Sequence, residues 1–209
     1  MKITKFEHAC FSVEHNGATI IVDPGEFTSD LVIPTTVVAI VITHEHGDHF
    51  SAEKIQAIAA TNPTLTVIAH ESITSQLGGI TSRAVAVGGI TTINDFELQF
   101  FGGEHAIIHS DIPVIPNLGV LINNTIFYPG DSFAVPALPI EVLALPVGAP
   151  WLKISEVIDY LIAVKPRLAF PTHDGVLSDN GKQIPDNRLP SFAATVGTTY
   201  QRLHEPLEL

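Results

Sequence analysis

The segment THEHGDH at residues 43–49 is the feature that most constrains this chain, because it follows the apolar run Val37–Ile42 directly. A continuous run of aliphatic and β-branched residues is typical of a buried strand. In extended backbone, residues two apart project to the same side, so His44 and His46 can bind one metal ion. Gly47 allows the chain to turn Asp48 and His49 toward a second ion. The sequence therefore predicts a strand that ends in a metal-binding loop.

Short strand-like runs separated by turn signals occur along the whole chain. The N-terminal runs Lys2–Glu7, Cys10–His15 and Ala18–Asp23 predict a meander, and Asn16-Gly17 is a strong hairpin signal. Further strands are expected at Leu65–Ala69, Ala84–Val87, Phe96–Phe101, Leu118–Ile122, Thr125–Tyr128, Val142–Leu145 and Arg167–Phe170. Helices are expected from the cap Ser51 to about Ala60, at Glu71–Leu77 and at Ile154–Val164.

Meanders followed by strand–helix alternation in both halves predict an α/β fold. We expect a four-layered αββα sandwich, with two mixed β-sheets inside and helices outside. With 209 residues, of which 45% are hydrophobic and 15% charged, the chain is expected to form one domain over residues 1–209.

The formal charge of −12 and the scattered lysines and arginines argue against a nucleic-acid partner. The single Cys10 excludes an internal disulfide and suits a reducing compartment. The N-terminus lacks an apolar run of signal-peptide length, and the apolar segment Leu31–Ile42 is too short to span a bilayer. We therefore expect a cytoplasmic protein with no membrane segment; a homo-oligomer remains possible.

Three further metal-ligand candidates each follow a strand-like run, namely His105, Asp131 and His173. A lone histidine or aspartate at a strand end is more often a surface or hydrogen-bonded residue. Their shared placement favours a common site, and the carboxylate of Asp131 could bridge two cations. Imidazole and carboxylate ligands suit zinc, with iron or manganese as alternatives.

These motifs resemble the metallo-β-lactamase superfamily of binuclear metal hydrolases. The matching residues occur in the family's order: Asp23 in IVDPG, the segment 43–49, His105, Asp131 in PGDS and His173 in PTHDG. The resemblance implies one ion on His44, His46 and His105, a second on Asp48, His49 and His173, and Asp131 bridging the two. His8-Ala9-Cys10-Phe11 further resembles the small metal-dependent hydrolases that include L-ascorbate-6-phosphate lactonase and the N-acylphosphatidylethanolamine phospholipase D type.

The resemblance implies a hydrolase that uses a metal-bridging hydroxide on a small-molecule substrate. Asp48 would orient the nucleophile and accept its proton, and Asp131 would hold both ions. His46 stands where flavodiiron oxidoreductases have glutamate, which favours hydrolysis over oxygen chemistry. A small ester or lactone is the expected substrate; the alternatives are a phosphodiesterase or phospholipase type and a non-catalytic metal-binding protein.

Four more residues are candidates for the pocket or for supporting the ligands. Asp23 is expected to accept a hydrogen bond from a ligand histidine, or else to stabilise the turn before Pro24. His8 fits a pocket residue and a core histidine equally well. His109 and Trp151 could line the pocket, but a surface histidine and a packing anchor are the alternatives. Motifs of serine hydrolases, P-loop enzymes and dinucleotide-binding proteins are absent.

Overall fold

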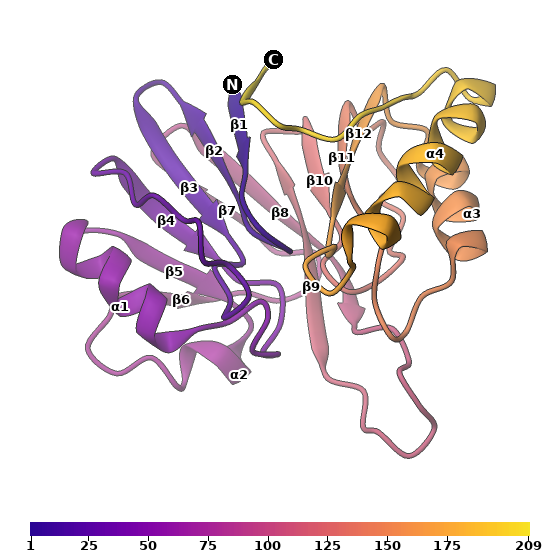
Figure 1. The fold of residues 1–209 in the computed structure, drawn as a ribbon. Coiled ribbons are helices and arrows are strands. Elements are labelled where there is room, and N and C mark those ends of the chain that lie inside the picture. Colours follow the sequence, from indigo (N-terminus) through magenta and orange to yellow (C-terminus); the bar gives the residue numbers. More distant parts are fainter.

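Two seven-stranded mixed β-sheets pack face to face, with helices on both outer faces, in the computed structural model, which describes residues 1–209 (Figure 1). A cluster of 21 buried hydrophobic residues, drawn from both sheets, fills the space between them. Two smaller clusters join each sheet to its own helices. The structure thus confirms the predicted four-layered α/β sandwich.

The first sheet holds the N-terminal strands and the C-terminal strand, in the order β14-β1-β2-β3-β4-β5-β6. The strands are β1 (Lys2–Lys5), β2 (Phe11–His15), β3 (Ala18–Val22), β4 (Val37–Val41), β5 (Thr66–Ala69), β6 (Ser82–Ala84) and β14 (Leu207–Glu208). Asn16 and Gly17 both have positive φ, as a tight hairpin between β2 and β3 requires. Helices α1 (Ala52–Thr61) and α2 (Glu71–Thr74) cover the outer face (Figure 1).

The second sheet is continuous in sequence, with the order β13-β12-β11-β10-β9-β8-β7. Its strands are β7 (Ile90–Ile93), β8 (Phe96–Glu104), β9 (Pro116–Ile122), β10 (Ile126–Tyr128), β11 (Val142–Pro146), β12 (Leu168–Thr172) and β13 (Thr199–Tyr200). Helices α3 (Ile154–Val164) and α4 (Asp179–Thr195) pack on its outer face. None of the helices combines the length and the apolar character that a membrane crossing requires.

Strand direction explains where a site can form. In the first sheet β1, β3, β4 and β5 run the same way, because β2 is antiparallel to both neighbours and the later pairs are parallel. In the second sheet β8, β10, β11 and β12 do likewise. Loops after these strands therefore gather at one edge of each sheet.

Most predicted elements are present, and the exceptions have physical reasons. Helix α4 was not predicted, because Pro185 and Pro190 lie inside it and proline disrupts helical hydrogen bonding. Pro185, Leu189 and Ala193 are buried at helical spacing, so tertiary packing outweighs this cost. The strand expected at Ala84–Val87 instead occupies Ser82–Ala84, and the edge strands β7, β13 and β14 were not predicted.

A candidate metal centre

Six side chains from three loops surround the carboxylate of Asp131, which lies on a fourth loop. Asp131 Oδ1 lies 3.1 Å from His49 Nε2, while Oδ2 lies 2.9 Å from His173 Nε2 and 3.3 Å from His105 Nε2. His44 Nε2 is 3.9 Å from Oδ2. The ring of His46 packs against those of His44 and His105, and Asp48 Oδ2 lies 3.4 Å from His173 Nε2. The structure therefore brings all seven predicted ligand residues together.

Several of these side chains present buried polar atoms without hydrogen-bond partners. They are the Nε2 atoms of His44, His49, His105 and His173, and Oδ1 of Asp131. Buried polar atoms in folded proteins almost always have partners, so a cluster of unpartnered ones needs an explanation. Imidazole nitrogens and carboxylate oxygens that converge on a shared space are suitable donors for divalent transition-metal ions. The residues present thus fit a metal site.

The hydrogen bonds on the far side of each ring determine which nitrogen is free. His105 Nδ1 donates to the carbonyl of Ala106 at 2.6 Å, and His173 Nδ1 donates to the carbonyl of Gly148 at 2.6 Å. A carbonyl only accepts, so the proton of each neutral ring lies on Nδ1. The lone pair of Nε2 therefore points toward Asp131, which is the arrangement that metal-binding histidines require.

Asp23 orients two of the candidate ligand histidines, His44 and His49, from the side away from Asp131. Its Oδ2 accepts from His49 Nδ1 at 2.7 Å and from Thr43 Oγ1 at 2.6 Å, and its Oδ1 accepts from the Thr43 amide at 2.8 Å. Since the Thr43 hydroxyl donates to Asp23, it accepts from His44 Nδ1, 3.0 Å away. Asp23 therefore fixes the ring orientation of His49 directly and of His44 through Thr43.

Residues that the sequence patterns did not single out hold the loops in place. A Cβ on Gly25 would lie 2.0 Å from the Asp48 carbonyl oxygen, so only glycine permits this approach of two loops. Asn117 accepts from the Asp131 amide at 3.0 Å and donates to the Pro129 carbonyl at 2.8 Å. The Pro24-Gly25 pair after Asp23 is a turn signal that could have pointed to Gly25. No local sequence pattern indicates the role of Asn117.

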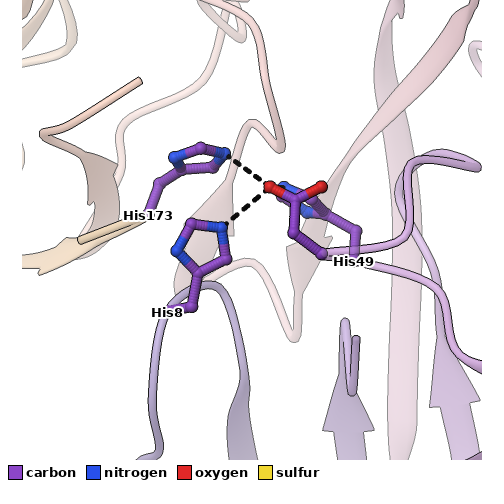
Figure 2. Close-up of side chains that lie close together, drawn as sticks. His8, His49 and His173 are labelled. Atoms are coloured by element: carbon purple, nitrogen blue, oxygen red, sulfur yellow. Dashed lines mark hydrogen bonds and ion pairs between the residues drawn. The ribbon is translucent and has the colours of Figure 1, made fainter. Parts of the chain in front are cut away.

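The remaining candidates have different positions. Trp151 Nε1 donates to Asp131 Oδ2 at 2.9 Å, and His8 Nε2 lies 2.9 Å from Asp48 Oδ2. Figure 2 shows His8 and His173 pointing to the same carboxylate oxygen, beside His49. The His109 side chain is 63% exposed and accepts from the Asp111 amide, so the structure does not bring it to the cluster. Its backbone belongs to an exposed loop, which the strand-like flanks did not indicate.

Close packing shifts the pKa values of these groups in opposite directions. Burial would raise the pKa of Asp131, but the charges of His49 and His173 outweigh it and hold that pKa well below its usual range. Burial lowers the pKa of His44 well below its ordinary value, and the neighbouring His49 adds to this effect. The site thus offers an ionised Asp131 beside a neutral His44. Burial would lower the pKa values of His49 and His173, but the charge of Asp131 raises that of His49 well above its ordinary value and that of His173 to about 9. Binding of an ion to these two imidazoles would therefore release their protons.

Comparison with known proteins agrees with this geometry. Residues 2–173, from β1 through the last ligand candidate, match the family model described as a beta-lactamase superfamily domain. The chain belongs to this superfamily. The resemblance predicted from the sequence motifs is thereby confirmed.

Similar proteins cover nearly the whole chain. Protein Rv0786c of Mycobacterium tuberculosis is 36% identical over 93% of this chain and 94% of its own length. A UPF0173 metal-dependent hydrolase of Carboxydothermus hydrogenoformans is 27% identical over 83% of this chain and 84% of its own. The structure of Igni18, a metallo hydrolase from Ignicoccus hospitalis, superimposes with a TM-score of 0.76 at 18% identity, covering 100% and 98% of the two chains. The last likeness concerns the fold alone.

Proposed function

We propose that this protein is a metal-dependent hydrolase that binds two divalent ions and cleaves small esters or lactones. The observation that carries the proposal is the set of buried, unpartnered imidazole nitrogens around the Asp131 carboxylate. His44, His46 and His105 would hold one ion, and Asp48, His49 and His173 the other, with Asp131 between them. Seven ligands exceed what one tetrahedral ion uses. Zinc suits this donor set best, with manganese or iron as alternatives.

Bound divalent ions would lower the pKa of a coordinated water and polarise the substrate carbonyl. Residues of this chain would position the attacking water and the ligand carboxylates. Asp48 is the ligand carboxylate that solvent reaches, with 20% of its side chain exposed against 3% for Asp131. It is therefore the group placed to orient the attacking water and to accept its proton. Trp151 donates to Asp131 Oδ2 and keeps that carboxylate directed at the ligand cluster.

The charge distribution favours a small and weakly charged substrate. No lysine or arginine pairs with any of the seven ligand residues, and Arg202 pairs with Asp174 and Asp186 instead. The overall charge of −12 opposes the approach of a polyanion. A small phosphodiester, whose charge the ions themselves would neutralise, is the second candidate substrate; RNA and DNA are not expected.

The free cysteine supports the proposed cytoplasmic location. Cys10 is fully buried immediately before β2, and it is the only cysteine in the chain. A protein without disulfides is suited to a reducing compartment.

The test uses one metal-loaded preparation and four substrates: a generic lactone, an aryl ester, bis(p-nitrophenyl) phosphate and a single-stranded oligonucleotide. Elemental analysis of the same preparation should find about two transition-metal ions per chain. We expect turnover of the lactone or the ester. Turnover of the phosphodiester alone would favour the second candidate, and preferential cleavage of the oligonucleotide would overturn the substrate proposal. Two bound ions without any turnover would favour a non-catalytic metal-binding protein.

A further inference from the structure

His8 lies beside the cluster of candidate metal ligands but is held by a set of contacts unlike those of the ligand histidines. It follows β1 in the β1–β2 loop, is fully buried and has a φ of 54°. Its carbonyl accepts from the His173 amide at 3.0 Å and from Lys5 Nζ at 2.6 Å. Its ring packs on that of His173, with 4.2 Å between centroids. These contacts fix both the backbone and the ring of His8 against the second-ion ligands.

The proton of His8 lies on the opposite nitrogen from that of the ligand histidines. The Gly175 amide donates to His8 Nδ1 at 3.0 Å, and a backbone amide cannot accept. Nδ1 therefore carries the lone pair, and the neutral ring carries its proton on Nε2. That proton points at Asp48 Oδ2, 2.9 Å away (Figure 2). In His105 and His173 the proton lies on Nδ1 instead.

By distance alone His8 would count as a ligand. Its ring nitrogen groups with Asp48, His49 and His173 within 4.8 Å, as a metal site would. A protonated Nε2, however, has no lone pair to give to an ion. It is also absent from the buried atoms that lack partners, in contrast to Nε2 of His49 and His173.

We propose that His8 is a positioning residue that donates a hydrogen bond to Asp48 and holds this carboxylate for the second ion. The inference rests on the proposed two-ion site. Asp48 needs such a partner because it is the more exposed ligand carboxylate, and its Oδ2 lies 3.4 Å from His173 Nε2 and 3.7 Å from His49 Nε2. Without His8 the Asp48 side chain is free to rotate toward solvent.

Gly175 makes this hydrogen bond possible. A Cβ at position 175 would lie 3.0 Å from His8 Cβ and 3.1 Å from His8 Nδ1, closer than side chains normally pack. Gly175 lacks the positive φ that would by itself demand glycine. Alanine at this position would therefore press on His8 without straining its own backbone.

The first experiment measures protonation and ligation in the unaltered protein. The chain is labelled with ¹⁵N, loaded with ¹¹³Cd and examined by NMR for cadmium coupling to ring nitrogens. We expect coupling at five histidines, 44, 46, 49, 105 and 173, and an uncoupled His8 that carries its proton on Nε2. Coupling at His8 would overturn the inference while two bound ions would leave the proposed function standing. Fewer than two bound ions would overturn both.

The second experiment separates positioning from other roles through matched variants. His8→Gln can still donate to Asp48 from the position of Nε2, whereas His8→Asn and His8→Ala cannot. We expect His8→Ala and His8→Asn to lower the affinity for the second ion by roughly 10–100-fold in chelator competition, as loss of an outer partner of a ligand does. His8→Gln should recover most of the affinity and of kcat. The affinity for the first ion should stay unchanged in all three, which also shows that they fold.

Gly175→Ala provides a test that leaves His8 itself in place. Gly175→Ala should lower the affinity for the second ion, as His8→Ala does. Gly78→Ala is the control, because a Cβ at position 78 meets open space, and it should leave this affinity unchanged. Equal second-ion affinity in wild type, His8→Ala and Gly175→Ala would overturn the positioning role. Loss of kcat in His8→Gln with full metal affinity would overturn it too, because it would assign proton transfer to the imidazole.

Discussion

The two halves of the molecule have the same strand plan but supply the site in different ways. Each sheet has antiparallel pairs at one side and parallel pairs at the other, and each carries an aspartate just after its fourth strand in that order. Asp23 follows β3, and Asp131 follows β10. Asp23 accepts three hydrogen bonds from Thr43 and His49, whereas Asp131 Oδ1 has no hydrogen-bond partner. Equivalent positions thus have different surroundings, and in the proposed site the neighbours of each carboxylate determine whether it orients ligand histidines, as Asp23 does, or is itself a ligand, as we propose for Asp131.

The halves also differ in how they deliver ligands. The N-terminal half presents four candidate ligand residues within the segment 43–49 of the loop after β4. The C-terminal half presents His105, Asp131 and His173 singly, after β8, β10 and β12. The four candidate ligands of segment 43–49 lie on one continuous stretch of backbone. The position of each C-terminal candidate depends on its own strand and loop.

Replacing Asp131 with alanine should give the largest effect, because this carboxylate contacts ligand residues on both sides of the site. We expect the metal content to fall from about two ions per chain to one or none. Activity should fall by more than the roughly 10–100-fold that loss of an outer-sphere partner costs. Elemental analysis together with kcat/KM measures both. Two ions retained in Asp131→Ala would contradict the bridged site.

Replacing Asp23 with alanine should affect stability as well as metal affinity, in contrast to Asp131. The change leaves the Thr43 amide and His49 Nδ1–H buried without an acceptor, which we expect to lower the free energy of unfolding by roughly 2–5 kcal/mol. Metal affinity should fall by roughly 10–100-fold. Denaturant unfolding and chelator competition measure the two effects. If stability stays unchanged, the supporting role of Asp23 is wrong.

Metal removal should expose a pH dependence to which one histidine of each half contributes, His49 and His173. Burial would lower the pKa of His173, but the negative charge of Asp131 and the Asp48 carboxylate beside its ring raise it to about 9. A raised pKa stabilises the folded state fully below the unfolded value of about 6.5, and this contribution is lost as pH rises through about 9. Unfolding of chelator-treated protein should therefore become easier from pH 6.5 to 9. The metal-loaded protein should lack this slope, because the ion replaces the proton.

Replacing Trp151 with phenylalanine should have a smaller effect, since it removes one hydrogen bond and keeps an aromatic ring. Loss of the Nε1 donor to Asp131 Oδ2 is expected to lower kcat/KM about tenfold, the equivalent of about 1.4 kcal/mol. The metal content should stay at that of wild type. A variant with wild-type kcat/KM would show that the ions alone hold the carboxylate.

Replacing His109 with alanine should have the smallest effect. Its side chain is largely exposed and its partner is the nearby Asp111 amide. We expect stability within about 0.5 kcal/mol of wild type and unchanged kcat/KM. A loss of activity would show that the loop from β8 to β9 reaches the substrate.

The sequence by itself determined the features that depend on neighbouring residues. The strand–loop–helix unit around 43–49, the Asn16-Gly17 hairpin and the amphipathic helix Ile154–Val164 were predicted from local spacing and are present with small shifts at their ends. Each is encoded by residues within one or two turns or strands, so periodicity and turn chemistry suffice to find it. Family membership was accessible for the same reason, because its motifs are short and contiguous.

Only the tertiary structure decided what depends on residues far apart in the chain. It placed His8 beside Asp48, and the Gly175 amide that donates to His8 Nδ1 leaves the ring proton on Nε2. It also left His109 exposed and apart from the candidate ligands. It also formed α4 in spite of two internal prolines, because buried contacts with the second sheet outweigh a poor local propensity. The role of a polar side chain is set by the donors and acceptors that folding brings to it, and a linear sequence does not state these partners.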